Sequence, residues 1–346
     1  MKAVFRLGAA AGLLLAAQAA GSVPVQAQAL DAFFKAQPFT ILVGYPPGAA
    51  YDMYARLVSR HIGQYLPGKP TVIVQNMAGA GSLSAANHLY NVARQDGSII
   101  GTFSRGITML PLIDSNGVRY DPLKFNWIGS PTGEVSLAIA WHDSGIRKFE
   151  DLQTRGMTAA TSGPGSDGNT YGRVLNAILG TKIKTVTGYQ GSAESMLAVE
   201  RKEVDGATAI SYAAIKTAHR DWIESKKVNL LVQHALKANA ELKDVPVILD
   251  FAKSEDDRRV LEMVFARQSI GYPYAAPPNV PADRLAAIRK AFDATMQDAA
   301  FLAEAAKTSS EIDPMTGQQL QALLEKLFSM PPAIAERAKQ AMQPPT

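Results

Sequence analysis

Glycines and other small residues recur in this sequence where apolar runs end, and loops of that kind bind anions through their backbone. Gly48-Ala49-Ala50 follows the apolar run 39–43, and Gly79-Ala80-Gly81-Ser82 follows the run 71–75. N–H groups at the start of a helix have no intrahelical partner, so a loop between a strand and a helix favours an anion. The residue types therefore predict non-covalent binding of a polar or anionic solute.

Residue patterns for catalysis or metal binding are not found in the sequence. The chain has no cysteine, which excludes thiol catalysis, thiolate metal sites and disulfides. Its five histidines have no ligand spacing, so we interpret them as helix-surface or lobe-edge residues. Ser162-Gly163-Pro164-Gly165 lacks the Gly-Lys-Ser/Thr ending of a phosphate loop, and the sequence contains no Gly-x-Ser-x-Gly elbow. We expect no cofactor and no metal.

Composition and charge indicate an exported globular protein. The 346 residues are 47% hydrophobic and 19% charged, with a net charge of +4. Without Lys2 and Arg6 the balance is 33 basic against 31 acidic residues, which leaves +2 and argues against nucleic-acid binding. Residues 1–27 have a basic start, an apolar core and the small-residue pattern Val25-Gln26-Ala27, which predicts a cleaved signal peptide.

The element pattern places the loops at the ends of strands in two α/β lobes. Predicted strands 39–43, 71–75 and 98–103 each end in a small-residue loop, as expected for parallel strands with loops at one sheet edge. The chain should cross to a second lobe near Ser130-Pro131, and strand 228–232 should lead back to the first. Further loops follow predicted strands in that second lobe. They are 162–168 after strand 157–161, 188–192 after strand 182–187, and Ser211-Tyr212.

Several stretches together resemble the Bug family, the periplasmic solute-binding proteins of tripartite tricarboxylate transporters. They are YPPGAAYDMYARL, VIVQNMAGAGSLSAANHLYNVARQDGSIIGT, VTGYQGSAESMLAVERKEVDGA and AAPPNVPADRLAAIRKAFDATM, and they occur in the family's order over nearly the whole chain. The resemblance implies an α/β type II periplasmic-binding-protein fold, with two lobes joined by a hinge that close like a Venus flytrap. We expect lobe 1 to comprise 28–129 and 238–346, and lobe 2 to comprise 130–237.

The resemblance also implies that loops from both lobes hold one ligand carboxylate. The residues it places at the ligand are Tyr45, Pro47, Gly48, Ala49, Ala50, Tyr51, Asp52, Ala80, Gly81, Ser82, Ser104, Arg105, Ser162, Gly165, Ser166, Asp167, Tyr189, Gly191, Ser192 and Ser211.

Three of these residues raise specific expectations. Asp52 should lie at the start of the first helix, where it caps N–H groups or orients a ligand group. Arg105 either pairs a second ligand carboxylate or forms a structural salt bridge. Tyr51 stands where the family often has a small polar residue, so we expect its phenol ring to form an aromatic wall of the site.

These observations predict a non-enzymatic, monomeric periplasmic protein. It should capture a small organic carboxylate, such as a di- or tricarboxylate, an aromatic acid or an acidic amino acid, and pass it to the transporter's membrane subunits. Two alternatives stay open. One is a partner that presents ligand to a membrane receptor, and the other is an exported enzyme on the same fold.

Overall fold

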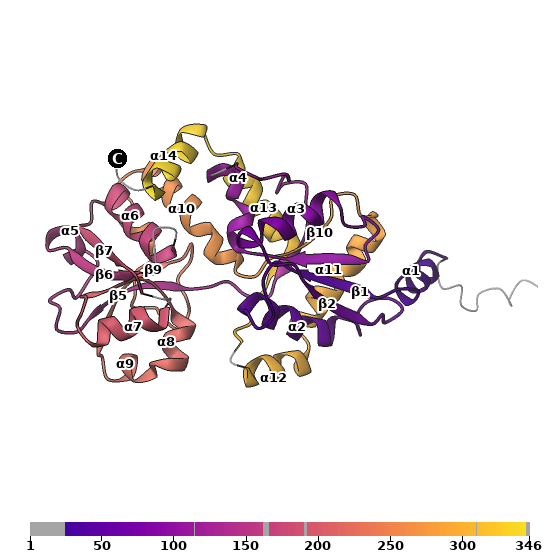
Figure 1. Ribbon diagram of the computed structural model, residues 1–346, viewed down its shortest axis with the longest axis horizontal. Coiled ribbons are helices and arrows are strands. Elements are labelled where there is room, and N and C mark those ends of the chain that lie inside the picture. The colour runs from indigo at the N-terminus through magenta and orange to yellow at the C-terminus, as the bar shows by residue number, and fades with distance from the viewer. Residues whose placement is uncertain (1–24, 114, 162–165, 190–191, 309, 344–346) are drawn as a thin grey trace, which may run out of the picture.

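The chain forms two α/β lobes that lie side by side (Figure 1). The computed structural model describes residues 25–113, 115–161, 166–189, 192–308 and 310–343. Each lobe is built on its own sheet, one of six strands and one of five. The expected two-lobe α/β fold is therefore confirmed.

The first sheet has the strand order β11-β4-β10-β3-β1-β2. β1 pairs in parallel with both β2 and β3, so these three strands end at the same edge, as the sequence pattern predicts. β10 lies between β3 and β4 and is antiparallel to both. The strands of this sheet are β1 (Phe39–Val43), β2 (Val72–Asn76), β3 (Ile99–Thr102), β4 (Asn126–Ser130), β10 (Tyr274–Ala276) and β11 (Met315–Thr316).

The second sheet has the order β7-β6-β8-β5-β9. β6 is parallel to β7 and β8, whereas β5 is antiparallel to β8 and β9. The 228–232 prediction corresponds to β9, which belongs to this sheet and is the last strand before the chain returns. The strands are β5 (Ser136–Trp141), β6 (Met157–Thr161), β7 (Ile183–Thr187), β8 (Gly206–Ser211) and β9 (Val228–His234).

Helices cover both faces of each sheet. The helices around the first sheet are α1 (Val25–Lys35), α2 (Ala50–Ile62), η1 (Ala80–Ser82), α3 (Leu83–Asn91), η2 (Arg105–Thr108), α4 (Leu110–Ile113), α11 (Ala282–Met296), α12 (Ala299–Lys307) and α13 (Gly317–Phe328). The others are α5 (Asp151–Thr154), α6 (Asp167–Leu179), α7 (Ser192–Glu200), α8 (Tyr212–Ala218), α9 (Arg220–Glu224), η3 (Ile248–Phe251), α10 (Glu255–Ile270) and α14 (Pro332–Met342). No helix among the described residues is long and apolar enough to cross a membrane.

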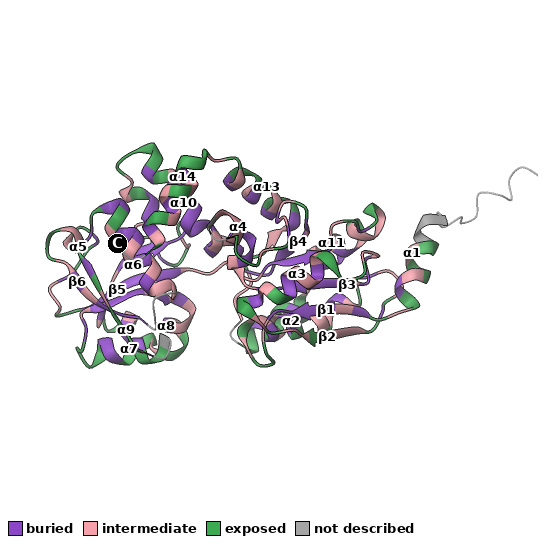
Figure 2. Cartoon of the chain, turned by 45° about the horizontal axis from the view of Figure 1, so that its top comes forward, coloured by how far each residue is buried: buried purple, intermediate pink, exposed green. Residues whose placement is uncertain are grey.

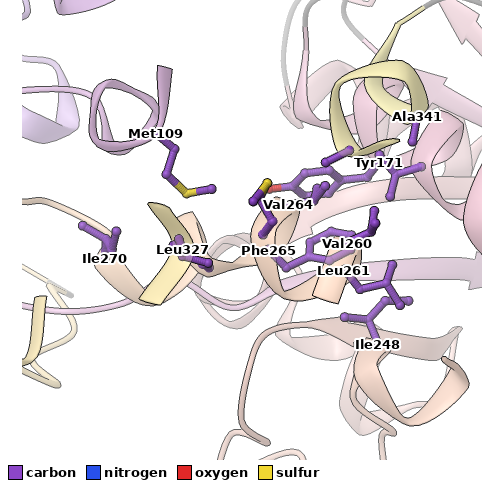
Figure 3. Close-up of a cluster of buried hydrophobic side chains, with 14 of the residues drawn as sticks. Met109, Tyr171, Ile248, Val260, Leu261, Val264, Phe265, Ile270, Leu327 and Ala341 are labelled. Carbon is purple, nitrogen blue, oxygen red and sulfur yellow. The ribbon is translucent and has the colours of Figure 1, made fainter. Parts of the chain in front are cut away.

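Most strands are buried because alternate residues face different helix layers (Figure 2), whereas the edge strands β2, β7 and β11 are only partly buried. In β1, Ile41 packs with α2 and α11, whereas Leu42 packs with α3. The cluster that contains Leu42 continues through α10 and α14 into the second lobe, and Figure 3 shows its central part around Tyr171 and Phe265. The lobes therefore share one continuous apolar core on this side.

Two chain segments cross between the lobes next to each other. The Glu134 N–H donates to the Gln268 carbonyl oxygen at 2.7 Å, which joins segment 131–135 to the end of α10. Gly271 has φ +54, and a Cβ there would lie 2.0 Å from the Thr132 carbonyl oxygen. Only glycine fits so close an approach. The lobe boundaries expected from the sequence stay a prediction. They assign α10 and α14 to lobe 1, because both lie beyond residue 237, yet both helices pack against α6 of the second lobe.

Candidate ligand-binding site

The loop before α2 is held by the buried carboxylate of Asp52. Oδ2 of Asp52 accepts the Gly48 N–H at 2.8 Å and Arg56 Nε at 2.9 Å, and Oδ1 accepts Asn76 Nδ2 at 2.8 Å. Burial disfavours the ionised form, yet the hydrogen bonds from Arg56, Gly48 and Asn76 hold the pKa of Asp52 below its ordinary value. Asp52 thus lies in the first helical turn as predicted, and its side chain fixes the loop.

The start of α2 itself has no side-chain cap. Its N-cap residue, Ala49, has extended backbone angles and accepts no hydrogen bond from the helix through its side chain. Gly48 precedes it with φ +85, which bends the chain out of β1 and toward the helix. Uncapped N–H groups of a helix of 13 residues suit an anion.

Ser82 ties the three loops of the first lobe together. Its hydroxyl donates to the Gly44 carbonyl oxygen at 3.0 Å and accepts the Ser104 N–H at 3.2 Å. Ser82 is fully buried and has φ +79, while the neighbouring Ala80 has φ +45. Non-glycine residues rarely adopt this conformation, so the surrounding contacts must hold it. Ser82 therefore positions the loops, and its hydroxyl is already used.

Tyr51 lies in a stack of tyrosines that connects the first lobe to the crossing segment. Its ring stacks on Tyr45 with centroids 4.6 Å apart and contacts Tyr272 at 4.8 Å. Its hydroxyl donates to the Gly271 carbonyl oxygen at 3.2 Å and accepts the Arg105 N–H at 3.0 Å. Burial raises the pKa of Tyr51 well above its ordinary value. Tyr51 thus joins the crossing segment at Gly271 to the loop after β3 at Arg105. This anchoring role is additional to the expected place of Tyr51 in an aromatic wall of the site.

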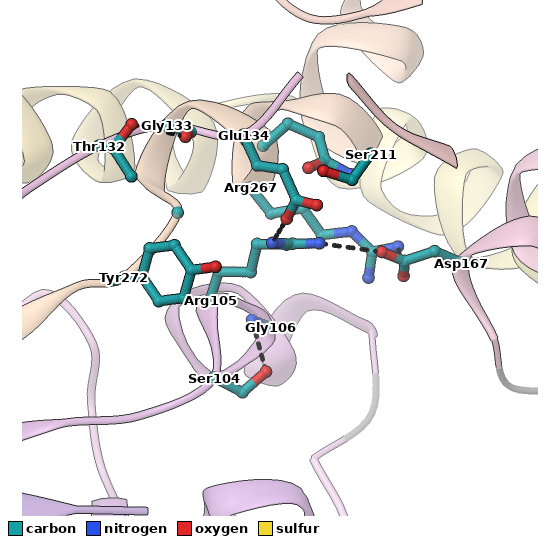
Figure 4. Close-up of polar contacts among 12 residues, drawn as sticks. Ser104, Arg105, Gly106, Thr132, Gly133, Glu134, Asp167, Ser211, Arg267 and Tyr272 are labelled. Carbon is teal, nitrogen blue, oxygen red and sulfur yellow. Dashed lines mark hydrogen bonds and ion pairs between the residues drawn. The ribbon is translucent and has the colours of Figure 1, made fainter. Parts of the chain in front are cut away.

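Arg105 makes ion pairs with two carboxylates from different parts of the fold (Figure 4). Nη1 donates to Glu134 in the crossing segment, and Nη2 donates to Asp167 of α6 at 3.2 Å. Arg267 of α10 donates to the other oxygen of Asp167 at 2.7 Å and, through Nε, to the Tyr171 hydroxyl at 3.2 Å. The structural salt bridge is therefore present and joins the lobes, while the contact of Arg105 with a ligand carboxylate stays a prediction.

These pairs favour the charged forms of Arg105 and Asp167. Burial of the Arg105 guanidinium favours its neutral form, but the neighbouring Glu134 and Asp167 carboxylates raise its pKa above the ordinary value. Burial likewise opposes ionisation of Asp167, and Arg267 and Arg105 hold the pKa of Asp167 below its ordinary value. Two arginines and two acids therefore form one neutral network.

Other predicted residues of the second lobe make local hydrogen bonds. Ser166 caps α6 by accepting the Asn169 N–H at 3.3 Å, and Ser211 caps α8 by accepting the Ala214 N–H at 3.4 Å. The Tyr189 hydroxyl donates to Glu203 at 3.4 Å. Ser162, Gly165 and Gly191 lie outside the described residues, and Ser192 is the first residue of α7.

A cavity of about 180 Å³ lies where α2, the crossing segments and the second lobe meet. Of the predicted residues, Ala50 and Ser211 line it. Sequence reasoning missed its other walls, which come from α2, α8, the crossing segments and the end of α12 with the loop that follows it. The sequence did contain one signal for the walls from the crossing segments, which is the glycine in each of them, at 133 and 271. The lining residues are Ala50, Met53, Tyr54, Thr132, Gly133, Glu134, Val135, Ser211, Ala213, Tyr272, Thr308, Ser310 and Glu311.

Comparison with known proteins decides the family. The model of the "Tripartite tricarboxylate transporter family receptor" matches residues 55–337, which is most of the chain. This chain belongs to that family. The family expected from the sequence motifs is thereby confirmed for this receptor.

Relatives match part of the sequence, and solved structures share the fold. A UPF0065 protein of Agrobacterium vitis is 32% identical over 182 residues, which is 50% of this receptor and 51% of that relative. A TctC solute binding protein from Polaromonas shares the fold with TM-score 0.69 and 15% identity, covering 88% of this receptor and 97% of that chain. An R. palustris protein with adipate gives TM-score 0.59 and 18% identity, with 87% and 97% covered.

Proposed function

We propose that this receptor captures a small organic carboxylate between its lobes and delivers it to the membrane subunits of a tripartite tricarboxylate transporter. The observation that carries the proposal is the uncapped start of α2, whose first residue, Ala50, lines the cavity at the junction of the lobes. Helix N–H groups hold a carboxylate without a buried lysine. The adipate in the R. palustris structure is a ligand of this chemical class.

The hydrogen bonds that fix the loops of the first lobe favour ligand binding. Ser82 holds the loops after β1, β2 and β3 in one arrangement, so their backbone groups are pre-organised for a ligand. The predicted second-lobe contacts, at Ser166, Asp167, Tyr189, Ser192 and Ser211 among others, complete the clamp. A ligand that touches both lobes favours the closed form through its higher affinity for that form.

A thermal-shift and calorimetry screen of the purified full chain tests the capture of carboxylates. Mono-, di- and tricarboxylates, aromatic acids and amino acids would be compared at millimolar concentration. At least one carboxylate should raise the melting temperature, because a ligand that binds the native state stabilises it by mass action. If no carboxylate raises it, the proposed function is wrong.

Export and delivery need separate experiments. N-terminal sequencing of exported protein should give a first residue close to Gln28, and a chain still starting at Met1 would contradict export by cleavage. A pull-down from membrane fractions, with and without ligand, should recover permease subunits. Recovery of a sensory receptor would favour ligand presentation, and turnover of a carboxylate would favour an enzyme.

A further inference from the structure

The cavity beside α2 is lined by two carboxylates, each of which is ion-paired with a base outside the lining. Among the described residues that line it, Glu134 and Glu311 are the charged ones, and both are acidic. The Glu134 side chain is 23% exposed and comes from the crossing segment, while Glu311 comes from the loop after α12. The two carboxylates therefore reach one space from different parts of the fold.

Positive groups near the cavity are already engaged. Arg105 is held by Glu134 and Asp167, and its side chain is only 17% exposed. Lys216 binds Glu311 at 2.6 Å and Glu241 at 3.0 Å. Around Lys216 two acids face one cation, so an additional anion would have to displace a carboxylate from its partner. Displacing Glu134 would leave it unpaired beside the ligand, which costs free energy.

Aromatic faces add to the preference for a cation. The rings of Tyr54 and Tyr272 both line the cavity and lie 4.1 Å apart, tilted by 30°. Aromatic faces attract ammonium groups through the ring quadrupole. Burial and, to a lesser degree, the nearby Glu311 and Glu134 carboxylates together raise the pKa of Tyr54 to about 12. The Tyr54 hydroxyl donates to the Glu311 backbone carbonyl oxygen at 3.0 Å, which holds the ring at the cavity wall.

We propose that this cavity takes the cationic end of a zwitterionic ligand, whose carboxylate binds at the start of α2. The ligand class is an amino acid with a short chain between the carboxylate and the ammonium group. Glu134 accepts the ammonium through Oε1, which has no hydrogen-bond partner in the described part of the chain, while Oε2 keeps Arg105. Tyr54 and Tyr272, which pack against each other, form one wall of the cavity beside the cation. This inference rests on the proposed function, which supplies the carboxylate end.

The decisive experiment compares three ligands at each chain length from three to six carbons. Each set has a terminal carboxylate at one end and an ammonium, a methyl or a second carboxylate at the other, as in 4-aminobutanoate, butanoate and succinate. Calorimetry on the full chain should give at least a tenfold lower Kd for the best aminocarboxylate than for the dicarboxylate of the same length.

The possible outcomes separate the two proposals. If a dicarboxylate binds more tightly than its amino counterpart, the cation site is wrong and carboxylate capture stands. If methyl-ended and ammonium-ended ligands bind equally, the cation site is also wrong. If no carboxylate binds in this panel or in the wider screen, both proposals fail.

Variants test the assigned residues. Glu134→Gln keeps the shape of the side chain and removes its charge. It should weaken 4-aminobutanoate, or the best aminocarboxylate of the panel, at least tenfold and strengthen the dicarboxylate, because Arg105 is then partly released. The matched control is Glu224→Gln, which removes the exposed partner of Arg220 on α9, outside the cavity lining, and should leave both affinities within twofold. Equal weakening of all ligands by Glu134→Gln would mean a purely structural role and overturn the assignment.

Discussion

Arg105 and Asp167 lie 62 residues apart in sequence and on different lobes, yet Nη2 of the arginine donates to Oδ2 of the aspartate at 3.2 Å. The other aspartate oxygen accepts Arg267 at 2.7 Å. The Asp167 carboxylate therefore links the loop after β3, which carries Arg105, to α6 and α10. The lobes are joined here by charge as well as by the shared apolar core.

Asp167→Asn should destabilise the unliganded protein by about 1–3 kcal/mol, because it removes two charge-assisted hydrogen bonds and leaves two guanidinium groups near each other. The loss should fall in the lower part of this range, because the Asp167 side chain is 37% exposed and solvent screens its charge. Urea denaturation measures the change. The control is Asp143→Asn, which breaks an exposed pair with Lys202 and should leave stability nearly unchanged. Equal effects of the two variants would show that Asp167 adds nothing to the junction.

Asp52 should make stability dependent on acid pH. Its pKa is lowered in the folded protein, so the unfolded chain takes up the proton first, near its ordinary pKa of about 3.9. The contribution is fully present above that pH and is lost as the pH falls through the folded value. Asp52→Asn should therefore be less stable than the parent at neutral pH, with the difference shrinking below about pH 4. A difference that stays constant from pH 7 to pH 3 would show that the charge of Asp52 is irrelevant.

Ser82→Ala should cost about 1–2 kcal/mol, because the buried Gly44 carbonyl and the Ser104 N–H each lose a partner. Ser82→Gly loses the same bonds but relieves the left-handed backbone, so it should be more stable than the alanine variant by several tenths of a kcal/mol or more. Ser59→Ala, at an exposed helical serine, is the control. If alanine is no worse at 82 than at 59, the hydroxyl does not tie the loops.

How far the sequence predicts this molecule depends on the range of each interaction. The strands and the loops that follow them were predictable, since apolar runs and turn residues act over a few neighbours, as at Phe39–Val43 and Gly48. The resemblance added the two-lobe architecture. The partners of Tyr51 were not predictable, because its hydroxyl bonds Gly271, which is 220 residues away. Local pattern carries no information about such a pair.

The prediction for the histidines was limited for the same reason. The expected surface or edge position is wrong for His234, which is fully buried at the end of β9. Its ring stacks on Phe265 with centroids 4.9 Å apart and meets Tyr171 edge-on at 5.0 Å. Within the described part of the chain, neither ring nitrogen has a hydrogen-bond partner. An apolar strand predicts burial at Val232, but only the tertiary packing shows that the same face extends to His234.

His234 should therefore weaken the protein as the pH falls. Burial lowers the pKa of His234 to about 3, opposed by the nearby Asp167 carboxylate. The unfolded chain binds this proton near pH 6.5, whereas the folded protein does not, so stability decreases as the pH drops between those values by at most about 1.4 kcal/mol per unit. His234→Phe keeps an aromatic ring on Phe265 and cannot titrate. The parent should lose stability relative to this variant from pH 6.5 to pH 4 in urea denaturation. Parallel pH profiles for the parent and His234→Phe would mean that the buried histidine is protonated equally in the folded and unfolded chains.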